Sequence, residues 1–217
     1  RFARMREPNR RESHMAEADR RPIAARNTGW AMGTARVLAR SGITPNQISV
    51  LSVAFALAGA AALLVWPDWR GMLACALCIL LRLLCNLFDG MVAVEAGRGA
   101  TPIGAVYNDV PDRIADALFL IAPAYLIGLP WLGWLAALLA ITTAYIRVLG
   151  GSLGLAQDFR GPMAKPHRMW LLGIALVVSA ALPMHAGPIM LWTLAIIAGG
   201  AALTCALRLR AIATQLA

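Results

Sequence analysis

Long apolar stretches constrain the fold of this sequence more than any other feature. A helix needs about 20 apolar residues to cross a bilayer, and charged residues make up only 14% of the chain, well below the usual quarter. Six stretches of this kind are found, at 48–66, 71–92, 103–127, 129–150, 169–184 and 187–206. The sequence therefore predicts an all-α integral membrane protein with six transmembrane helices.

The distribution of basic residues predicts the orientation of these helices. The net charge of +9 comes from arginines before the first stretch, in alternate connections and in the C-terminal tail, whereas the other connections carry little more than Arg70. Positive charge marks cytoplasmic loops, so both termini are expected in the cytoplasm. The excess then reflects topology and attraction to anionic lipids, and no nucleic-acid partner is expected. Nineteen arginines against one lysine are typical of a GC-rich bacterial genome, which indicates the inner membrane.

Three segments are predicted along the chain. Residues 1–26 are basic and lack apolar periodicity, so we expect them to be disordered. Residues 27–42 alternate apolar and basic side chains, which favours a short amphipathic helix on the cytoplasmic interface. Residues 43–217 hold the six spans and the catalytic residues, and Thr44-Pro45 supplies a cap and a first-turn proline for the first span.

Carboxylates are concentrated around the second and third stretches. Five of the 11 acids fall between positions 86 and 116, although an ionisable group in a membrane helix costs several kcal/mol without a partner or a function. Two helical faces carry the polar residues, one with Arg82, Asn86 and Asp89 and the other with Gly104, Asn108, Asp112 and Asp116. Antiparallel neighbours would bring both faces together as oxygen ligands for a hard divalent cation. Alternatively, Arg82 and Arg113 neutralise acids in a purely structural buried network.

The same residues resemble the signature of the CDP-alcohol phosphotransferase superfamily, Asp-x2-Asp-Gly-x2-Ala-Arg followed by Gly-x3-Asp-x3-Asp. This chain reads Asn86-x2-Asp89-Gly90-x2-Ala93-Val94, nine residues, then Gly104-x3-Asn108-x3-Asp112. The segment from Ile43 to Ser49 also looks like the family's entry to its first span. The resemblance covers roughly residues 27–210.

The resemblance implies a phospholipid-synthesis enzyme. It would transfer a phosphatidyl or phosphoalcohol group from a CDP-activated donor, CDP-diacylglycerol or a related CDP-alcohol, to an alcohol acceptor and release CMP. Family members use divalent cations, Mg or Mn, and a homodimer is expected. The acceptor's proton would go to Asp112. The implied metal ligands are Asn86, Asp89, Asn108, Asp112 and Asp116, and the implied CDP-binding residues are Asn46, Asp89, Gly90, Ala93 and Gly104.

A second group of basic residues follows the fourth stretch. Arg147, Lys165 and Arg168 resemble the basic residues with which some family members hold a phosphate on the acceptor or the lipid. The alternative is that these residues simply carry the positive charge of a cytoplasmic loop.

Asn86 and Asn108 replace two of the signature acids, and Val94 replaces the arginine. An asparagine oxygen can ligate a cation but brings no charge, so the matched positions supply −2 instead of −4. Three readings follow: compensation by other charged residues, a site with one cation instead of two, or loss of catalysis in a relative that still binds lipid or nucleotide. Residues available for compensation are Arg82, Glu95, Arg98, Asp109 and Asp116. A small cation- or proton-coupled transporter is a further alternative from a different class.

Overall fold

The computed structural model describes residues 28–95 and 102–217, and the regular structure of these residues is entirely helical. Each predicted stretch corresponds to one helix, so the all-α prediction is confirmed. The helices are α2 (Gly29–Arg40), α3 (Pro45–Val65), α4 (Trp69–Glu95), α5 (Pro102–Leu126), α6 (Pro130–Ser152), α7 (Lys165–Ala181), the short 3-10 helix η2 (Pro183–His185) and α8 (Ala186–Leu216). The predicted segment 1–26 lies outside the described residues. Helix α2 falls within the predicted segment 27–42.

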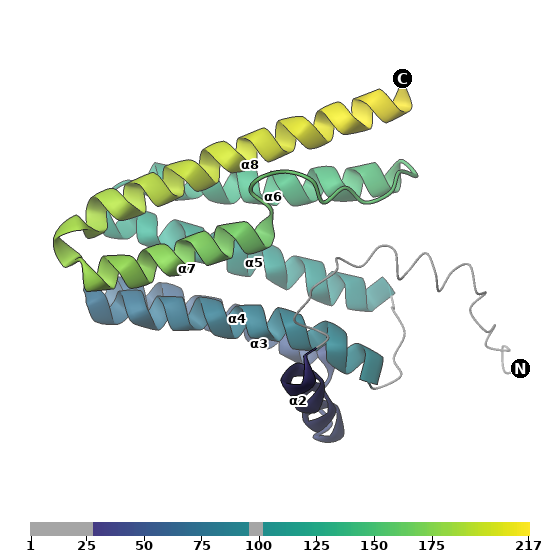
Figure 1. Ribbon diagram of the computed structural model, residues 1–217, viewed down its shortest axis with the longest axis horizontal. Coiled ribbons are helices and arrows are strands. Elements are labelled where there is room, and N and C mark those ends of the chain that lie inside the picture. Colours follow the sequence, from purple (N-terminus) through teal and green to yellow (C-terminus); the bar gives the residue numbers. More distant parts are fainter. Residues whose placement is uncertain (1–27, 96–101) are drawn as a thin grey trace, which may run out of the picture.

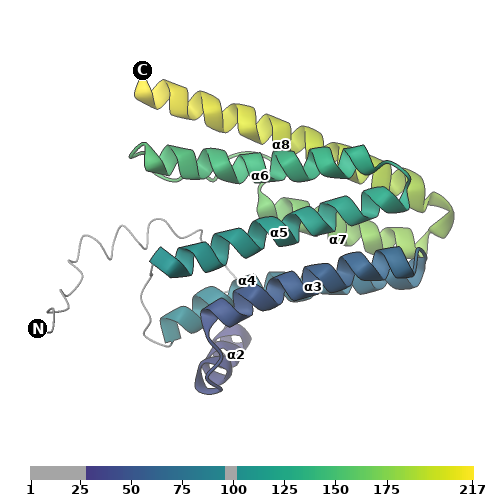
Figure 2. The ribbon, with the colours of Figure 1, turned by 180° about the vertical axis from the view of Figure 1, so that it is seen from behind.

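Helices α3 to α8 form a closed ring, which we call the helix ring. Around it, α4 contacts α3, α3 contacts α5, α5 contacts α6, α6 contacts α8, α8 contacts α7, and α7 returns to α4. The long helices run side by side, and α2 crosses the end of α4 at a steep angle (Figures 1 and 2). A ring of this kind brings residues from distant parts of the sequence to a shared interior.

The two ends of the helix ring differ in character. At one end α4 stops, α5 starts, α6 passes into the connection to α7, and α8 finishes (Figure 1, right). We call this the polar end, because the acidic stretch begins there. The opposite end holds the short connections between α3 and α4, α5 and α6, and α7 and α8.

Local sequence signals explain where α3 begins. The Thr44 hydroxyl accepts a hydrogen bond from the Gln47 amide, and the Gln47 side chain accepts one from the Thr44 amide, which together form a capping box. Pro45 follows at the first helical position, where its missing N–H costs nothing. The predicted cap and first-turn proline are thus confirmed, and they fix the start of α3 beside the acidic part of α4.

Small residues allow the helices of the ring to approach closely. A Cβ on Gly59 of α3 would lie 2.9 Å from both Cys78 Cβ of α4 and Phe119 Cε1 of α5. Phe119 is fully buried at this junction of three helices. Since a side chain at position 59 would separate α3 from both neighbours, this glycine sets the spacing of α4 and α5 that the site depends on.

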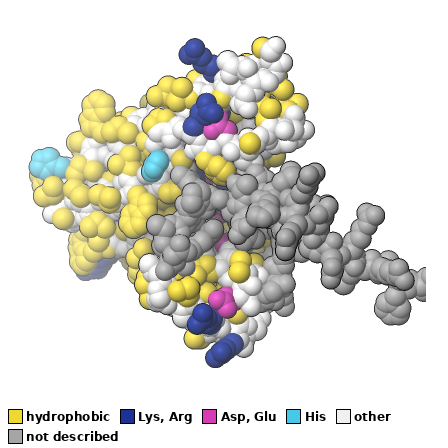
Figure 3. All heavy atoms as spheres, turned by 45° about the vertical axis from the view of Figure 1, so that its right-hand side comes forward, with side chains coloured by type: hydrophobic (Ala, Val, Ile, Leu, Met, Phe, Trp, Pro, Cys, Tyr) yellow, Lys and Arg dark blue, Asp and Glu magenta, His cyan; other side chains and the backbone are white. Residues whose placement is uncertain are grey.

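The protein is a multi-pass membrane protein. Four segments of the described chain are long and apolar enough to span a bilayer: α3, α4, α6, and η2 continued by α8. Helix α7, with 17 residues, is shorter than a typical span, and α5 carries four charged residues between Asp109 and Asp116. Apolar side chains cover much of the flank, while charged side chains appear in small groups toward the polar end (Figure 3).

Candidate functional site

Arg82 of α4 is the centre of an ion network that joins α4 to α5. Its side chain is fully buried, and Nη2 lies 3.1 Å from Asp112 Oδ1 and 2.5 Å from Asp116 Oδ1. One guanidinium reaches both carboxylates because Asp112 and Asp116 stand one turn apart on α5. A buried charge network, which was one of the two interpretations of the sequence, therefore exists between these helices.

Asn86 completes the contact between the two halves of the signature. In the orientation that satisfies both amide atoms, its oxygen accepts from Arg82 Nη1 at 2.8 Å and its nitrogen donates to Asp112 Oδ1 at 2.8 Å. An aspartate at this position could accept from Arg82 but could not donate to Asp112. The asparagine is therefore matched to its two neighbours.

Helix α7 supplies two more basic side chains to the same acids. Lys165 Nζ forms an ion pair with Asp112 Oδ2, and Arg168 Nη2 lies 3.3 Å from Asp116 Oδ2. Arg168 is 1% exposed, and its Nη1 also donates to the Met163 carbonyl at 2.8 Å. Both residues begin α7, so the predicted second basic group and the acidic stripe form one site.

Asp89 is held from a third direction. The Ser49 hydroxyl of α3 donates to Asp89 Oδ2 at 3.0 Å in a buried position. Asn46 lies three residues before Ser49 and therefore on the same side of α3, toward α4. Ser49 was missed in the sequence reading. Its signal was present, because a hydroxyl lies one turn after the conspicuous Thr44-Pro45-Asn46 entry.

The remaining predicted residues differ in their surroundings. Gly90, Ala93 and Gly104 are half-buried in the turns of α4 and α5 that approach the polar end. Asn108 is exposed one turn before Asp112, so its side chain is not part of the buried network. Asp109 pairs with Arg147 of α6 at 3.2 Å.

One candidate for charge compensation lies away from the network. Glu95 pairs with Arg36 of α2 at 3.6 Å, which ties the end of α4 to that helix. Arg98 lies outside the described residues. Of the residues available for compensation, the structure brings Arg82 and Asp116 into the buried network.

The connection between α6 and α7 is packed against the same end of the ring. Arg208 of α8 donates through Nε to the Arg160 carbonyl at 2.9 Å and through Nη1 to the Thr143 carbonyl at 2.7 Å. Arg147 lies over the Phe159 ring at 5.5 Å. In the sequence, Arg208 counts among the charges of the C-terminal tail, whereas the structure places it one turn after the buried Thr204, on the inward face of α8.

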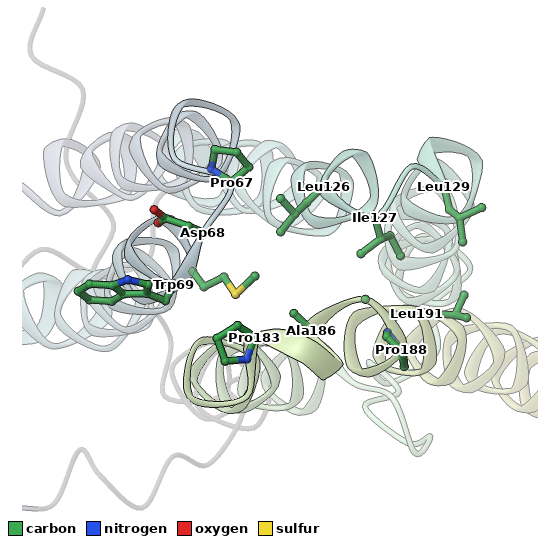
Figure 4. A pocket seen from close by; sticks show the side chains of 12 residues that line it. Pro67, Asp68, Trp69, Leu126, Ile127, Leu129, Pro183, Ala186, Pro188 and Leu191 are labelled. Carbon is green, nitrogen blue, oxygen red and sulfur yellow. The ribbon is translucent and has the colours of Figure 1, made fainter.

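Two hollows lie outside this network. One, of about 540 Å3, is at the opposite end of the ring, between Trp69 of α4, Leu126 of α5 and the α7–α8 connection (Figure 4). Its acid, Asp68, accepts a hydrogen bond from the Arg70 amide and so helps to start α4. The other, of about 270 Å3, is a nearly wholly apolar groove between α4 and α7 that includes Leu83 and Met169. Of the lining residues of the groove, Leu83 and Met169 directly follow Arg82 and Arg168 in sequence.

The donor atoms of the site suit a hard cation in part. Asp89, Asn86 and Asp112 offer carboxylate and amide oxygens from α4 and α5, the ligand type that Mg2+ and Mn2+ prefer. Among the described residues, however, no three His, Cys, Asp or Glu side chains are grouped so as to hold a metal ion. The described residues therefore offer oxygen ligands of the right kind without forming a complete metal site by themselves.

Buried acids and basic residues at one end of a ring of membrane helices define a membrane protein with a charged interior site. No protein-family model matches the chain. Two relatives are phosphatidylinositol phosphate synthases. That of Mycobacterium marinum is 30% identical over 201 residues, covering 83% of this chain and 78% of the relative. That of Mycobacteroides abscessus is 27% identical over 192 residues, covering 70% and 80%.

Solved structures agree with these relatives. The phosphatidylinositol phosphate synthase of Mycobacterium tuberculosis in complex with manganese and citrate has a TM-score of 0.73 and 25% identity, covering 85% of this chain and 89% of that one. Its complex with CDP-DAG has a TM-score of 0.70 and 25% identity, covering 84% and 92%. This chain belongs to the CDP-alcohol phosphotransferase superfamily, as the signature predicted, and is an enzyme of that class.

Proposed function

We propose that this enzyme transfers the phosphatidyl group of CDP-diacylglycerol to the hydroxyl of a phosphorylated alcohol and releases CMP. The observation that carries the proposal is the contact between the two halves of the signature, where Asn86 of α4 meets Asp112 of α5 at 2.8 Å. The mycobacterial relative solved with CDP-DAG supports this donor. The names of the relatives support an inositol phosphate as the first acceptor to test.

In the reaction, the acceptor oxygen forms a bond to the phosphorus that carries diacylglycerol. The bond from that phosphorus to the bridging oxygen breaks, and CMP leaves with the electron pair. Asp112 takes the proton of the acceptor hydroxyl, as a positioned general base does. Its Oδ1 is fixed by Arg82 and Asn86, whereas Oδ2 faces Lys165 and, at 3.7 Å, Arg113, so Oδ2 is the atom that becomes free when these two basic side chains turn toward a phosphate.

A divalent cation at Asp89, Asn86 and Asp112 would neutralise charge that develops on the donor's pyrophosphate. The manganese complex of the mycobacterial relative supports such a cofactor. We assign these three residues to the cation because their oxygens come from facing turns of α4 and α5. Asn108 joins them as an outer ligand, and Asp116 is assigned to holding the two arginines in place.

The CDP moiety is assigned to the polar end, near Asn46, Gly90, Ala93 and Gly104. These residues lie on α3, α4 and α5 around the acids, and the small ones leave room for a nucleotide. The acyl chains are assigned to the apolar groove between α4 and α7, since Leu83 and Met169 follow Arg82 and Arg168 directly in sequence.

The acceptor's phosphate is assigned to the basic residues of α6 and α7. Lys165 is 22% exposed in its side chain and Arg147 is 20% exposed, so both can be reached from the polar end. Arg168 is buried, and its Nε has no partner in the described structure. It is assigned to holding Asp116 in place. A phosphate would replace carboxylates as the partner of these cations.

The membrane topology belongs to the same proposal. Helices α5 and α7 span the bilayer together with α3, α4, α6 and α8, because each runs antiparallel to the spanning helices that precede and follow it in the chain. Both termini and the polar end are cytoplasmic, α2 lies on that interface, and the enzyme is a homodimer. Residues 43–217 act as the catalytic domain, and the segment 1–26 remains a prediction of disorder.

The test is product formation by the purified enzyme in detergent. CDP-diacylglycerol and Mn2+ are supplied with inositol phosphate, glycerol phosphate, inositol, serine or choline, and the lipid product is identified by mass spectrometry. The proposal expects a phosphatidyl product with a phosphorylated acceptor and at least about tenfold less with inositol, serine or choline, because a charge-assisted hydrogen bond contributes 1.5–3 kcal/mol. A clear preference for an uncharged acceptor would contradict the assignment of Lys165 and Arg147.

A further inference from the structure

Arg82 has a contact set that resembles the ligand set of a metal ion. Besides Asp112 Oδ1 and Asp116 Oδ1, its Nη2 lies 3.4 Å from the Asp112 carbonyl oxygen, and Nη1 meets the Asn86 amide oxygen. All these contacts are to oxygen atoms, from two helices, around a side chain with no exposed surface. Hard divalent cations are surrounded by oxygens of the same kinds.

The acids of the network already have enough basic partners without a metal. Three acids, Asp89, Asp112 and Asp116, stand with Arg82, Lys165 and Arg168, and Arg113 is a fourth base, 3.7 Å from Asp112 Oδ2. A guanidinium does not lose its proton in proteins, so the charge of Arg82 is permanent. Lys165 and Arg113 are the bases that can leave, because their side chains are each 22% exposed, whereas Arg82 and Arg168 are buried. Their departure leaves three acids with two arginines, a net charge of −1, which one divalent cation is enough to neutralise.

We propose, on the basis of the proposed function, that Arg82 is a built-in cation that takes the place of a second metal ion. The site then binds one divalent cation, at Asp89, Asn86 and Asp112. This arrangement explains why asparagine stands at positions 86 and 108, because an acid at either position would add negative charge that no second ion is present to neutralise. Asn86 in addition uses both amide atoms to bridge Arg82 and Asp112.

The direct test is the number of Mn2+ ions bound per chain. Purified protein in detergent is titrated with Mn2+, and free Mn2+ is measured by electron paramagnetic resonance. The wild type is expected to bind one ion. The triple variant Arg82→Gln, Asn86→Asp, Asn108→Asp restores the acids and removes the built-in cation, so it is expected to bind two. Its first ion should bind at least about tenfold more tightly, because a like charge a few ångströms away has been removed.

A matched control separates the position of Arg82 from net charge. The variant Asn86→Asp, Asn108→Asp, Arg210→Gln has the same formal charge as the triple variant but keeps Arg82, and Arg210 is exposed near the end of α8. It is expected to bind one ion. Two ions in the wild type or in this control, one ion in the Arg82 triple variant, or none in the wild type would overturn the proposal.

The number of Mn2+ ions bound by the wild type is measured without any substitution, so it tests the proposal even if an Arg82 variant fails to fold. CMP release measured on the same preparation tests the transferase reaction separately from the role of Arg82. Release with two bound ions would refute the role of Arg82 and leave the transferase intact. One bound ion without release under any acceptor would refute the transferase and leave the cation count standing.

Discussion

At the scale of single residues, the site is organised around a carboxylate held from both sides. Asp112 is 6% exposed and receives Arg82 and Asn86 on one oxygen and Lys165 on the other. Arg113 adds a more distant contact at 3.7 Å. A buried charge pair stabilises little on its own, and removing one partner is expensive. The arrangement is therefore better explained by the positioning of Asp112 than by stability.

Lys165 gives the sharpest prediction at this scale. Lys165→Gln removes a charge-assisted partner of the acceptor's phosphate, worth about 1.5–3 kcal/mol, so the KM for the phosphorylated acceptor should rise by about tenfold or more. Steady-state kinetics with varied acceptor at saturating CDP-diacylglycerol measure it.

The control for Lys165→Gln is Arg210→Gln, which removes an exposed positive charge from α8. It is expected to leave the acceptor KM unchanged. An unchanged acceptor KM in Lys165→Gln, with only kcat reduced, would contradict phosphate binding and assign Lys165 to the positioning of Asp112 alone.

At the scale of elements, the connection between α6 and α7 depends on one glycine. Gly161 has φ +119°, and an added Cβ would lie 2.4 Å from Thr204 Cγ2 of α8. Gly161→Ala therefore combines backbone strain with a clash and should destabilise the protein by about 1–3 kcal/mol. Thermal unfolding in detergent measures the loss.

Gly154→Ala is the matched comparison for this connection. Gly154 also has a positive φ, +82°, but nothing lies within 4 Å of its added Cβ. Its substitution should cost only the backbone strain and lower the melting temperature less than Gly161→Ala. Equal losses in the two variants would show that the packing of Gly161 on α8 does not matter.

The groove between α4 and α7 gives a second prediction for the elements. Gly173 of α7 lines it, and a Cβ there would still be 3.8 Å from Ile79 Cγ2, so an indole can enter the groove. Gly173→Trp should raise the KM for CDP-diacylglycerol by about tenfold or more, because it takes the volume assigned to an acyl chain.

Gly199→Trp on α8 adds the same bulk at an exposed position with nothing within 4 Å of the added Cβ. It should leave the donor KM near the wild-type value. If Gly173→Trp behaved like Gly199→Trp in kinetics with varied CDP-diacylglycerol, the acyl chains would have to bind elsewhere.

At the scale of the whole molecule, the proposed six crossings place the two ends of the helix ring on opposite sides of the membrane. Asp68 marks one end and Arg210 the other. In a variant without its four native cysteines, Asp68→Cys should react with an impermeant maleimide from outside intact cells. Arg210→Cys should react only after the cells are opened. Labelling of both positions from the same side would contradict an even number of spans.

Much of this architecture could be predicted from the sequence. Apolar length gave one helix for each stretch, and the cap at Thr44-Pro45 was recognisable because a proline and a hydroxyl form a local signal. Spacing by three and four placed Asn86 and Asp112 each on the polar face of its own helix, since that rule depends only on helical geometry.

The partners across the ring could not be predicted in the same way. Ser49 reaches Asp89 from 40 residues away, and Arg208 reaches Thr143 from 65. These contacts depend on which helices are neighbours in the ring, and a single sequence contains no direct record of that. The role of Arg82 was open for the same reason, because its partners on α5 are 30 and 34 residues distant.

The central claim is that Asp112 serves a CMP-releasing transfer at the polar end. The most direct measurement compares CMP release from CDP-diacylglycerol by the wild type, Asp112→Asn and Asp68→Asn, each with Mn2+ and a phosphorylated acceptor. Asp112→Asn should lose about a hundredfold or more in rate, the usual contribution of a general base. Asp68→Asn, the same change at the opposite end, should retain the wild-type rate. A wild type that releases no CMP, or an Asp112→Asn variant as fast as the wild type, would contradict the account.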